Sequence, residues 1–424
     1  MRCLVDGISH SGEGVARIEG KATFIPFTIP GETVEVKIVD EKKNFQRASL
    51  EEVLSASSDR TEPPCPYFFK CGGCAYQHIS YPRQLELKGQ VLKDSLKRIG
   101  GIDIDVNPVL GMEDPWRYRN KVEWHTGSKS DQRTMGYYIN DSRVLMGIDS
   151  CLLISRKMQN YSNYIKDHLE ELKIPEGCEV ILRQSSANQE LMLIFGGPGS
   201  RGIDFAKMLN YKEVASIYSV EDGVAQLHYG DKALPEKIFN LKYQVSPLSF
   251  FQVNPQQTEK MMDTIRDYTQ LGPGDTVLDA YCGTGSIALN LAGSARKVVG
   301  VESFKAAIRD AKRNAFKNNI SNCKFIKGVC EQIIPDLEEK FDVVILDPPR
   351  TGCKPELIEA LIKMAPKRIV YVSCNPATLA RDLALFAKDG FTVKDVQPID
   401  MFPQTSHVEC CVLLYRKDYI GEKV

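Results

Sequence analysis

From Tyr243 onward, short apolar runs alternate with segments of helical periodicity, and this alternation limits the fold more than any other feature. Continuous apolar runs are typical of strands buried on both faces, as in a parallel sheet covered by crossover helices. The sequence therefore predicts an α/β, Rossmann-like domain over residues 243–424 with a mostly parallel sheet. The expected strands are residues 276–280, 297–301, 323–327, 341–346, 368–373 and 409–415.

The first 56 residues have a different pattern, in which short strands are separated by glycine turns. Thr33–Ile38 alternates polar and apolar residues with a period of two, as a half-buried strand does. About five such strands fit this length, which predicts a small β-barrel over residues 1–56. Lys42, Lys43 and Arg47 lie near its last turn, where they either contact phosphate groups or belong to a solvated loop.

Residues 57–242 have the mixed pattern of an α+β domain. An amphipathic helix is expected over residues 81–99, with Leu85 and Leu92 among its apolar residues. In Trp116–Lys121, basic and aromatic residues alternate, which suits contact with RNA phosphates and stacking on bases. An edge strand with exposed charges is an equal alternative for this segment.

Charge and composition indicate the general class of the protein more clearly than they indicate its binding partner. The chain has 54 Lys and Arg against 55 Asp and Glu, and a net charge of −1. This balance argues mildly against a nucleic-acid binder, yet it cannot reveal a local basic groove. Because there is no run of about 18 apolar residues and no signal-peptide pattern, we expect a cytoplasmic protein that does not bind membranes.

Thirteen cysteines are many for a cytosolic chain, and their odd number argues against a disulfide framework. Cys65, Cys71 and Cys74 have the spacing C-x5-C-x2-C around Gly72–Gly73, where glycines let backbone N–H groups face sulfur. Cys151 is the best-placed fourth ligand, because most other distant cysteines fall in the predicted C-terminal domain. An iron–sulfur cluster is our first expectation, zinc the alternative, and unligated buried cysteines a third reading.

A glycine-containing turn, Asp279–Gly285, follows a predicted strand and opens a helix. Gly283 and Gly285 permit close approach of a ligand to the backbone. The D-x-x-x-G-x-G pattern lacks the third glycine of dinucleotide-binding loops and better matches S-adenosylmethionine methyltransferases. Glu302 ends the next strand, where a carboxylate can accept the hydroxyl groups of a ribose.

Two further strand ends carry reactive residues. Asp347-Pro348-Pro349-Arg350 follows an apolar strand; in methyltransferases such a segment lies beside the cofactor and the target atom, and an ordinary turn is the alternative. Cys374 directly follows the apolar strand Arg368–Ser373. A cysteine at a strand end, in a domain that also has a cofactor loop, predicts a nucleophile.

Two segments carry a resemblance to a known family: Ser373–Asp382, with the pattern SCNP-x-TLARD, and Asp400–Glu409, with the pattern DMFP-x-T-x-H-x-E. Over nearly its whole length the chain closely resembles the RNA uracil-5-methyltransferases. The resemblance implies an N-terminal TRAM barrel that binds RNA, a 4Fe–4S cluster on the four cysteines, and a seven-stranded sheet that binds S-adenosylmethionine. The barrel and cluster together look like the enzymes that modify 23S ribosomal RNA, and we expect a monomer. The resemblance also suggests that the helix over residues 81–99 packs against the C-terminal domain, so that the domains are not contiguous in sequence.

The resemblance also implies roles for individual residues. Cys374 is the nucleophile that adds to C6 of uracil, and Glu409 is the base that removes the C5 proton. Arg381 either assists the nucleophile, orients uracil or forms only a structural salt bridge. Because the target base must reach Cys374, it leaves its stack or lies in an unpaired loop. Contacts with cofactor or uracil are expected from Gln252, Tyr281, Gly283, Gly285, Glu302 and Asp347, and stacking on a base from Phe250.

The sequence departs from the family at two places, and other functions stay open. Ser286 replaces an asparagine of some relatives, and Val329–Cys330 stands where relatives often carry a polar residue near adenine. The alternatives are methylation of a tRNA T-loop uridine, a non-catalytic RNA-binding protein, and a base-amine methyltransferase that uses Asp347–Arg350. The last needs no Cys374, so Cys374→Ala distinguishes it from uracil methylation.

Overall fold

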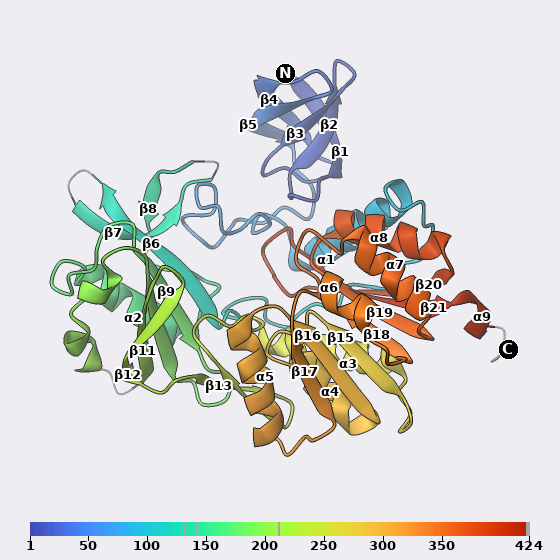
Figure 1. The fold of residues 1–424 in the computed structure, drawn as a ribbon. Coiled ribbons are helices and arrows are strands. Elements are labelled where there is room, and N and C mark those ends of the chain that lie inside the picture. Colours follow the sequence, from blue (N-terminus) through green and yellow to red (C-terminus); the bar gives the residue numbers. More distant parts are fainter. Residues whose placement is uncertain (130–131, 141, 211–212, 421–424) are drawn as a thin grey trace.

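A computed structural model describes residues 1–424 apart from 130–131, 141, 211–212 and 421–424. Its strands form a closed barrel and two larger sheets (Figure 1). The barrel stands at the top of the view, above the central sheet on the left and the C-terminal sheet on the right. The predicted α/β fold class, with a small N-terminal barrel and a central α+β part, is confirmed.

The barrel closes because its first strand pairs with both its second and its fourth strand. Along the fourth strand, Val34 and Val36 are buried while Glu35 and Lys37 are exposed, so one face points inward and the other outward. In spatial order the strands are β1 (Arg2–Ile8), β2 (Gly14–Ile18), β3 (Lys21–Ile25), β5 (Phe45–Ser55) and β4 (Thr33–Glu41).

The central sheet packs one face against a helix. Its strand β10 (Leu191–Gly196) is buried along its whole length, and Met158, Tyr161 and Ile165 of the helix α2 (Arg156–Asp167) join its core. A hairpin of β13 (Leu234–Ile238) and β14 (Leu241–Val245) leads onward, and η1 (Ser200–Gly202) and η2 (Phe205–Asn210) are short turns. The sheet order is β12 (Val224–Gly230), β11 (Val214–Glu221), β10, β9 (Glu179–Gln184), β6 (Lys121–Lys129), β7 (Gln132–Tyr138) and β8 (Leu145–Gly147).

The C-terminal sheet has seven strands within the described residues. Their order is β17 (Cys323–Lys327), β16 (Lys297–Glu302), β15 (Thr276–Ala280), β18 (Val343–Leu346), β19 (Arg368–Ser373), β21 (Glu409–Arg416) and β20 (Phe391–Ile399). The first five run parallel, and β21 is antiparallel to both of its neighbours. The chain order reverses beside β15, which is where a crevice forms at the carboxyl ends of strands.

Helices cover both faces of this sheet, because successive strand residues point to opposite sides. Val277 packs against the helices on one face of the sheet, and Leu278 packs against those on the other face. One face carries α3 (Pro255–Thr269), α4 (Ser286–Leu291) and α5 (Lys305–Lys317); the other carries α1 (Tyr81–Arg98), α6 (Cys330–Ile333), α7 (Pro355–Met364) and α8 (Pro376–Lys388). Short pieces are η3 (Ala292–Ser294), η4 (Ile334–Asp336) and α9 (Lys417–Ile420).

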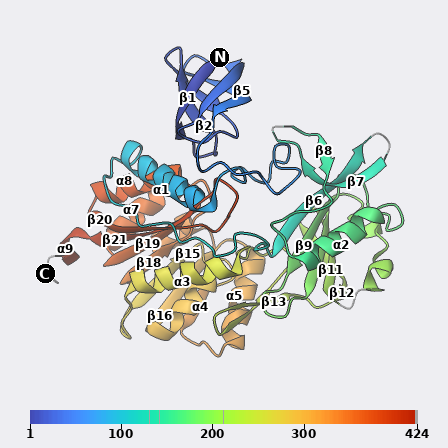
Figure 2. The same cartoon turned by 180° about the vertical axis from the view of Figure 1, so that it is seen from behind.

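Helix α1 comes early in the chain but packs on the C-terminal sheet beside α8 (Figure 2). Leu92 and Leu96 are fully buried and share a core with Leu278. The chain then follows β20, where the N–H of Asn107 donates to Val396 and that of Leu110 to Pro398, each over 3.0 Å. Residues 81–110 are therefore structurally part of the C-terminal domain.

Three details differ from the sequence prediction. The sequence located only six of the seven strands that the resemblance implies. The seventh, β20, is an edge strand whose half-exposed polar residues and Pro398 obscure the apolar pattern. Strand β18 begins at Val343 rather than residue 341, because the Asp342 carboxylate binds the Thr276 N–H. Helix α1 ends at Arg98, one residue early. No helix in the described ranges is long and apolar enough to cross a membrane.

Candidate active site

The carboxyl ends of β15, β16, β18 and β19 meet at one edge of the C-terminal sheet and carry the residues predicted for chemistry. The segments that follow β15 and β18 lie side by side because these strands pair in parallel. Across the antiparallel β19–β21 ladder Ser373 pairs with Cys410, which puts Cys374 next to Glu409. Ligands bind in such a crevice in open α/β sheets.

The turn after β15 has backbone conformations that favour glycine. Gly283 and Gly285 have positive φ angles of 54° and 81°, and a Cβ atom on Gly285 would lie 3.0 Å from the Phe325 ring. The Gly283 N–H donates to a carboxylate oxygen of Glu302 over 3.3 Å. Tyr281, also at positive φ, is half-buried in the same turn. The structure thus brings these predicted cofactor residues together.

Acidic side chains gather around this turn. Burial and then the charges of Asp347 and Glu302 raise the pKa of the fully buried Asp279 to about 8. One Asp279 oxygen accepts the Ala288 N–H over 2.9 Å, and Oδ1 has no hydrogen-bond partner among the described residues. A buried free acceptor in an acidic pocket fits a ligand with donor groups and a positive charge, as S-adenosylmethionine has.

Cys374 is half-buried at the end of β19, close to Glu409 and Asp347. Burial and then the charge of Glu409 raise the pKa of its thiol to about 11, while the charge and a hydrogen bond of Arg350 oppose this rise. Burial and then Asp347 raise the pKa of Glu409 well above its usual range, and burial raises that of Asp347 to about 7. At neutral pH the free protein therefore holds Cys374 as the thiol, and burial favours the protonated form of Glu409.

Arg350 is a site residue that the sequence analysis did not assign, although it directly follows Asp347-Pro348-Pro349. Its backbone carbonyl accepts the side-chain amide of Asn375 over 3.0 Å. The Asn375 side chain also caps α8 by accepting the Ala377 and Thr378 N–H groups. Asn375, the residue after Cys374, thereby holds the loop that carries Arg350.

Arg381 lies on the outer side of this loop. Its guanidinium pairs with Asp382 over 2.7 Å and donates to the carbonyls of Thr351 and Cys353 over 2.9 and 3.2 Å. These bonds agree with the structural salt bridge that the sequence left open. Arg381 supports the loop that carries Arg350.

Phe250 and Gln252 lie on the loop between β14 and α3. The Phe250 side chain is 67% exposed, as a residue that stacks on a base needs to be. The Gln252 carbonyl accepts the Asn120 side-chain amide over 3.3 Å, which joins this loop to the central part of the chain. The loop is also anchored where the Ser249 hydroxyl donates to Asp310 over 2.8 Å.

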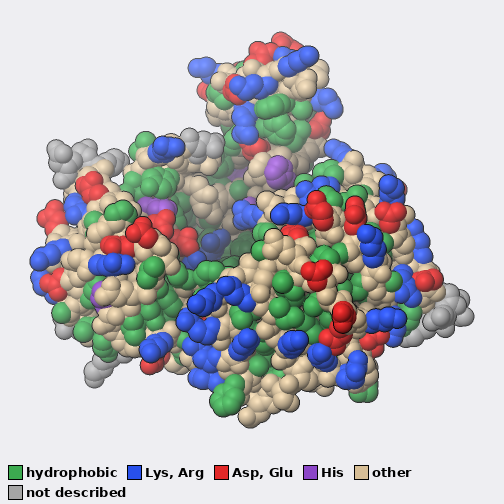
Figure 3. All heavy atoms as spheres, in the orientation of Figure 1, with side chains coloured by type: hydrophobic (Ala, Val, Ile, Leu, Met, Phe, Trp, Pro, Cys, Tyr) green, Lys and Arg blue, Asp and Glu red, His purple; other side chains and the backbone are tan. Residues whose placement is uncertain are grey.

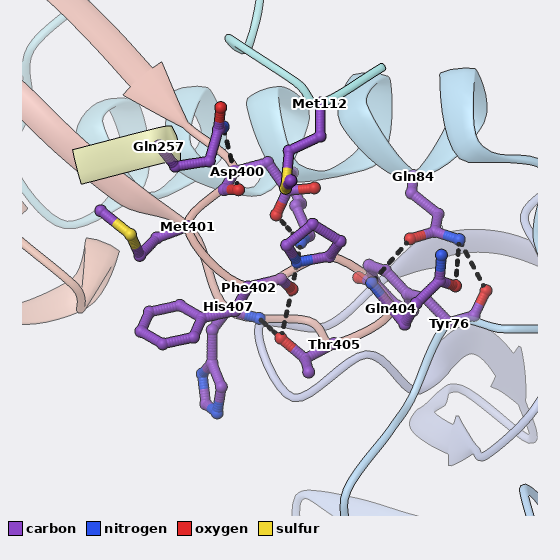
Figure 4. A network of polar contacts seen from close by, with 12 residues as sticks. Tyr76, Gln84, Met112, Gln257, Asp400, Met401, Phe402, Gln404, Thr405 and His407 are labelled. Atoms are coloured by element: carbon purple, nitrogen blue, oxygen red, sulfur yellow. Dashed lines mark hydrogen bonds and ion pairs between the residues drawn. The ribbon is translucent and has the colours of Figure 1, made fainter. Parts of the chain in front are cut away.

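The loop Asp400–His407, which leads into Glu409, is held by residues far away in the sequence (Figure 4). Gln84 of α1 binds Gln404 twice: its amide donates to Gln404 Oε1 over 3.0 Å, and its Oε1 accepts the Gln404 N–H over 3.2 Å. The Gln404 carbonyl accepts the backbone N–H groups of the two residues after Cys74, both over 3.0 Å. The cysteine segment, α1 and the loop before Glu409 are thus joined directly.

A buried ion pair fixes the start of this loop. The side chains of Lys88 and Asp400 are both fully buried, with Nζ and Oδ1 2.5 Å apart. The Tyr81 hydroxyl donates to the other Asp400 oxygen over 2.8 Å, and Lys88 also donates to the Phe402 carbonyl over 3.1 Å. Sequence reasoning missed this pair, because it joins positions 312 residues apart.

The four predicted ligand cysteines influence one another electrostatically. Burial raises the pKa of Cys74 to about 12, and Cys151 and Cys71 add to the rise; burial, Cys151 and Cys65 also raise that of Cys71. The Gly73 N–H donates to Cys71 Sγ over 3.4 Å. Among the described residues, no three His, Cys, Asp or Glu side chains are arranged so that they could hold a metal ion.

This arrangement bears differently on the two metal hypotheses. A structural zinc ion requires its four thiolates to converge on one centre, which the described side chains do not provide. In a 4Fe–4S cluster each thiolate binds a different iron, so the sulfurs stand farther apart. The iron–sulfur cluster and the zinc ion thus both stay predictions for these four cysteines.

A cavity of about 560 Å³ opens between the barrel, the cysteine segment and the C-terminal sheet, in the hollow at the centre of Figure 3. Arg47, Arg119 and Arg350 line it from three parts of the chain, and the Arg119 guanidinium lies 5.9 Å from the centre of the Phe402 ring. The net charge argued mildly against nucleic-acid binding, but the local arrangement of cations is favourable for it.

Comparison with known proteins agrees with this site. Residues 224–417 match the family described as tRNA (Uracil-5-)-methyltransferase, and residues 1–50 match the TRAM domain. Proteins of Clostridium tetani and Bacillus cereus, named as uncharacterized RNA methyltransferases, are 39% and 38% identical. The matches cover 99% and 97% of this chain and 96% of each relative. The chain belongs to the RNA uracil-5-methyltransferase family.

A solved structure of the family also spans the whole molecule. The Pyrococcus abyssi tRNA (uracil-54, C5)-methyltransferase, in complex with S-adenosyl-L-homocysteine, is 28% identical with a TM-score of 0.77. The match covers 98% of this chain and all of that one. The present protein is accordingly an S-adenosylmethionine-dependent RNA methyltransferase, and its match with that tRNA methyltransferase extends over nearly the whole chain.

Proposed function

We propose that this enzyme methylates C5 of a specific uridine in 23S ribosomal RNA, with Cys374 as nucleophile and Glu409 as general base, acting as a cytoplasmic monomer. The observation that carries the proposal is the β19–β21 register, since it sets Cys374 beside Glu409. Asp347 neighbours both residues, and Arg350 binds the thiol. The base-amine alternative gives no role to this thiol and carboxyl pair.

The proposed reaction has an addition step, in which Cys374 acts, and an elimination step, in which Glu409 acts. Cys374 loses its proton to solvent, and its sulfur forms a bond to C6 of uracil while the C5=C6 electron pair moves toward C5. Tyr281, Gly283, Gly285 and Glu302 would hold S-adenosylmethionine, which would supply the methyl group for C5 by cleavage of its S–CH3 bond, leaving S-adenosylhomocysteine. Glu409 then takes the C5 proton, the C5=C6 double bond forms again, and the bond between C6 and Cys374 breaks.

The cation of Arg350 makes this sequence feasible at neutral pH. It stabilises the thiolate of Cys374 in a site where burial and neighbouring carboxylates favour the thiol. Glu409 must be ionised when it acts as base, whereas in the free site burial and Asp347 raise its pKa and so oppose ionisation. We propose that the incoming uracil and the positively charged cofactor lower the pKa of Glu409 by bringing compensating charge and hydrogen bonds.

The choice of RNA rests on the whole chain. The TRAM barrel with the cysteine segment resembles the 23S enzymes, which favours ribosomal RNA. The Pyrococcus abyssi relative, with the same architecture over its full length, acts on tRNA, which favours the T-loop uridine as second candidate. In either substrate the target uridine must leave its stack or lie in an unpaired loop to reach a thiol buried in a crevice.

We further propose that Cys65, Cys71, Cys74 and Cys151 hold a 4Fe–4S cluster with a structural role. The segment after Cys74 binds Gln404, so a cluster there would fix the loop that leads to Glu409. Iron and sulfide analysis of anaerobically purified protein tests this. About four of each per chain are expected, and fewer in Cys71→Ser, which should lose folding or RNA affinity before chemistry.

The deciding experiment maps 5-methyluridine separately in 23S rRNA and tRNA from cells that lack the gene and from complemented cells. Loss at one or two 23S positions, restored by wild type but not by Cys374→Ala, is the expected result. Loss confined to tRNA would keep the mechanism and replace the substrate. Unchanged 5-methyluridine in both RNAs would refute the proposed function.

A further inference from the structure

One face of α5 carries a row of exposed cations that ends in an exposed aromatic ring. Lys305, Arg309, Lys312 and Phe316 have the spacing i, i+4, i+7 and i+11, which places them on one side of a helix. All four are exposed, and Phe316 is 84% exposed. The row extends about 16 Å along the helix axis. We call these four residues the α5 row.

Among the described residues, no partner gives the cations of the α5 row a structural role. The helix contains five basic residues and a single acid, Asp310. Asp310 is fully buried, and its carboxylate already binds Arg313, Ser246 and Ser249. In the described part of the chain, no carboxylate forms an ion pair with the cations of the row. This concentration of positive charge on one helix contrasts with the net charge of −1 of the whole chain.

The α5 row is continuous with the active site. Helix α5 begins three residues after Glu302, and Asp310 anchors the loop that carries Phe250. Arg309 also lies near Tyr218 of β11, where its charge opposes the rise that burial causes in the tyrosine pKa. The row therefore runs along the border between the C-terminal and central sheets, and Figure 3 shows basic side chains over this helix.

We infer that the α5 row is a second RNA-docking surface, which binds the phosphate backbone of a single strand leaving the active site past Phe250. This inference rests on the proposed function. Unpaired Lys and Arg on one line suit consecutive phosphates, because each neutralised phosphate releases a counterion. Phe316 offers a ring on which an unpaired base stacks, as in sequence-tolerant binding of single strands. The surface lies outside the cavity lined by Arg47, Arg119 and Arg350.

The test compares two triple variants of the full-length enzyme with equal loss of charge. One is Lys305→Gln/Arg309→Gln/Lys312→Gln. The control, Lys363→Gln/Lys388→Gln/Lys394→Gln, removes exposed lysines on and near α7, α8 and β20, toward the opposite edge of the sheet. Affinity for long polyuridylate is measured over a range of salt concentrations. With about 0.7 counterions released per phosphate, the slope of log K against log salt should fall by about 2 in the α5 variant only.

Three further readouts keep the inference separate from the proposed reaction. Phe316→Ala should weaken polyuridylate binding at least about fivefold, as loss of one stacked base does. Binding of S-adenosylhomocysteine and turnover at saturating RNA should be unchanged in the α5 variant. An equal slope in both triple variants overturns the inference. If the slopes are equal and only the α5 variant loses binding to phosphatidylserine vesicles, the row binds lipid headgroups instead of RNA. If the wild-type enzyme methylates no RNA but the α5 variant still has the smaller slope, the proposed reaction is wrong and the inferred RNA-docking surface is retained.

Discussion

At the scale of single residues, the proposed mechanism gives Arg350 the task of favouring the thiolate of Cys374. Its charge and hydrogen bond oppose the effects of burial and of the charges of Glu409 and Asp347 on the thiol. Arg350→Met should raise the pKa of Cys374 above its value of about 11, because the thiolate loses a charge-assisted hydrogen bond. Only the thiolate reacts, so alkylation of Cys374 at mildly alkaline pH should slow about tenfold.

Mass spectrometry of the peptide that contains Cys374, after timed exposure to iodoacetamide, measures this rate. Raising the pH should restore the rate of the Arg350→Met variant, since the variant needs a higher pH for the same fraction of thiolate. Lys363→Met, which removes a distant exposed cation, serves as control. An alkylation profile identical to wild type would remove Arg350 from the activation of the nucleophile.

In the proposed mechanism, Glu409 acts at a later step than Cys374. If Glu409 removes the C5 proton, Glu409→Gln permits addition and methyl transfer but prevents elimination. Turnover should fall about 100- to 10,000-fold, the usual contribution of a general base. A covalent protein–RNA adduct that resists denaturation should accumulate with uridine-containing substrate RNA and S-adenosylmethionine. Cys374→Ala is the control that forms none, and an adduct-free Glu409→Gln variant would place the carboxyl before methyl transfer.

At the scale of elements, the sequence predicts what is local and misses what is distant. The parallel strands follow from continuous apolar runs, and the loop of Gly283 and Gly285 follows from backbone conformations that glycine favours. Strand β20 was missed because an edge strand keeps polar residues. The contacts of Gln84 and Lys88 with the loop before Glu409 leave no local pattern, since each side chain alone reads as the polar face of α1.

The Lys88–Asp400 pair should be costly to break from one side. Lys88→Met leaves the Asp400 carboxylate buried without its cation, which destabilises a protein by about 3–5 kcal/mol. Adding Asp400→Asn should recover part of the loss, because the uncompensated charge is removed. Denaturant unfolding followed by tryptophan fluorescence and circular dichroism measures both variants. Lys93→Met on the same helix, whose pair with Asp105 is exposed, should cost less than about 1 kcal/mol; an equal cost would contradict the argument.

At the scale of the whole molecule, the catalytic unit is not continuous in sequence. Leu92 and Leu96 of α1 complete one face of the C-terminal sheet, and residues 107–110 extend its edge along β20. Two buried leucines contribute about 3–6 kcal/mol, which is comparable to the stability of an ordinary domain. A boundary drawn at residue 243 therefore removes part of the core from the domain that holds the cofactor loop.

The resulting prediction compares two shortened chains. Residues 243–424 alone should lack a cooperative thermal transition and bind S-adenosylhomocysteine weakly, because Leu278 and its neighbours lose their cover. Residues 80–112 joined to 243–424 by a flexible Gly/Ser linker should unfold cooperatively and bind the ligand, as calorimetry can measure for both. The same fusion with Leu92→Asp and Leu96→Asp is the matched control and should behave like the bare fragment, because a charge in this core lacks a partner. Equal stability and equal ligand binding with and without residues 80–112 would contradict this prediction. The C-terminal domain would then fold without α1, and the boundary at residue 243 that the sequence predicts would also be its structural boundary.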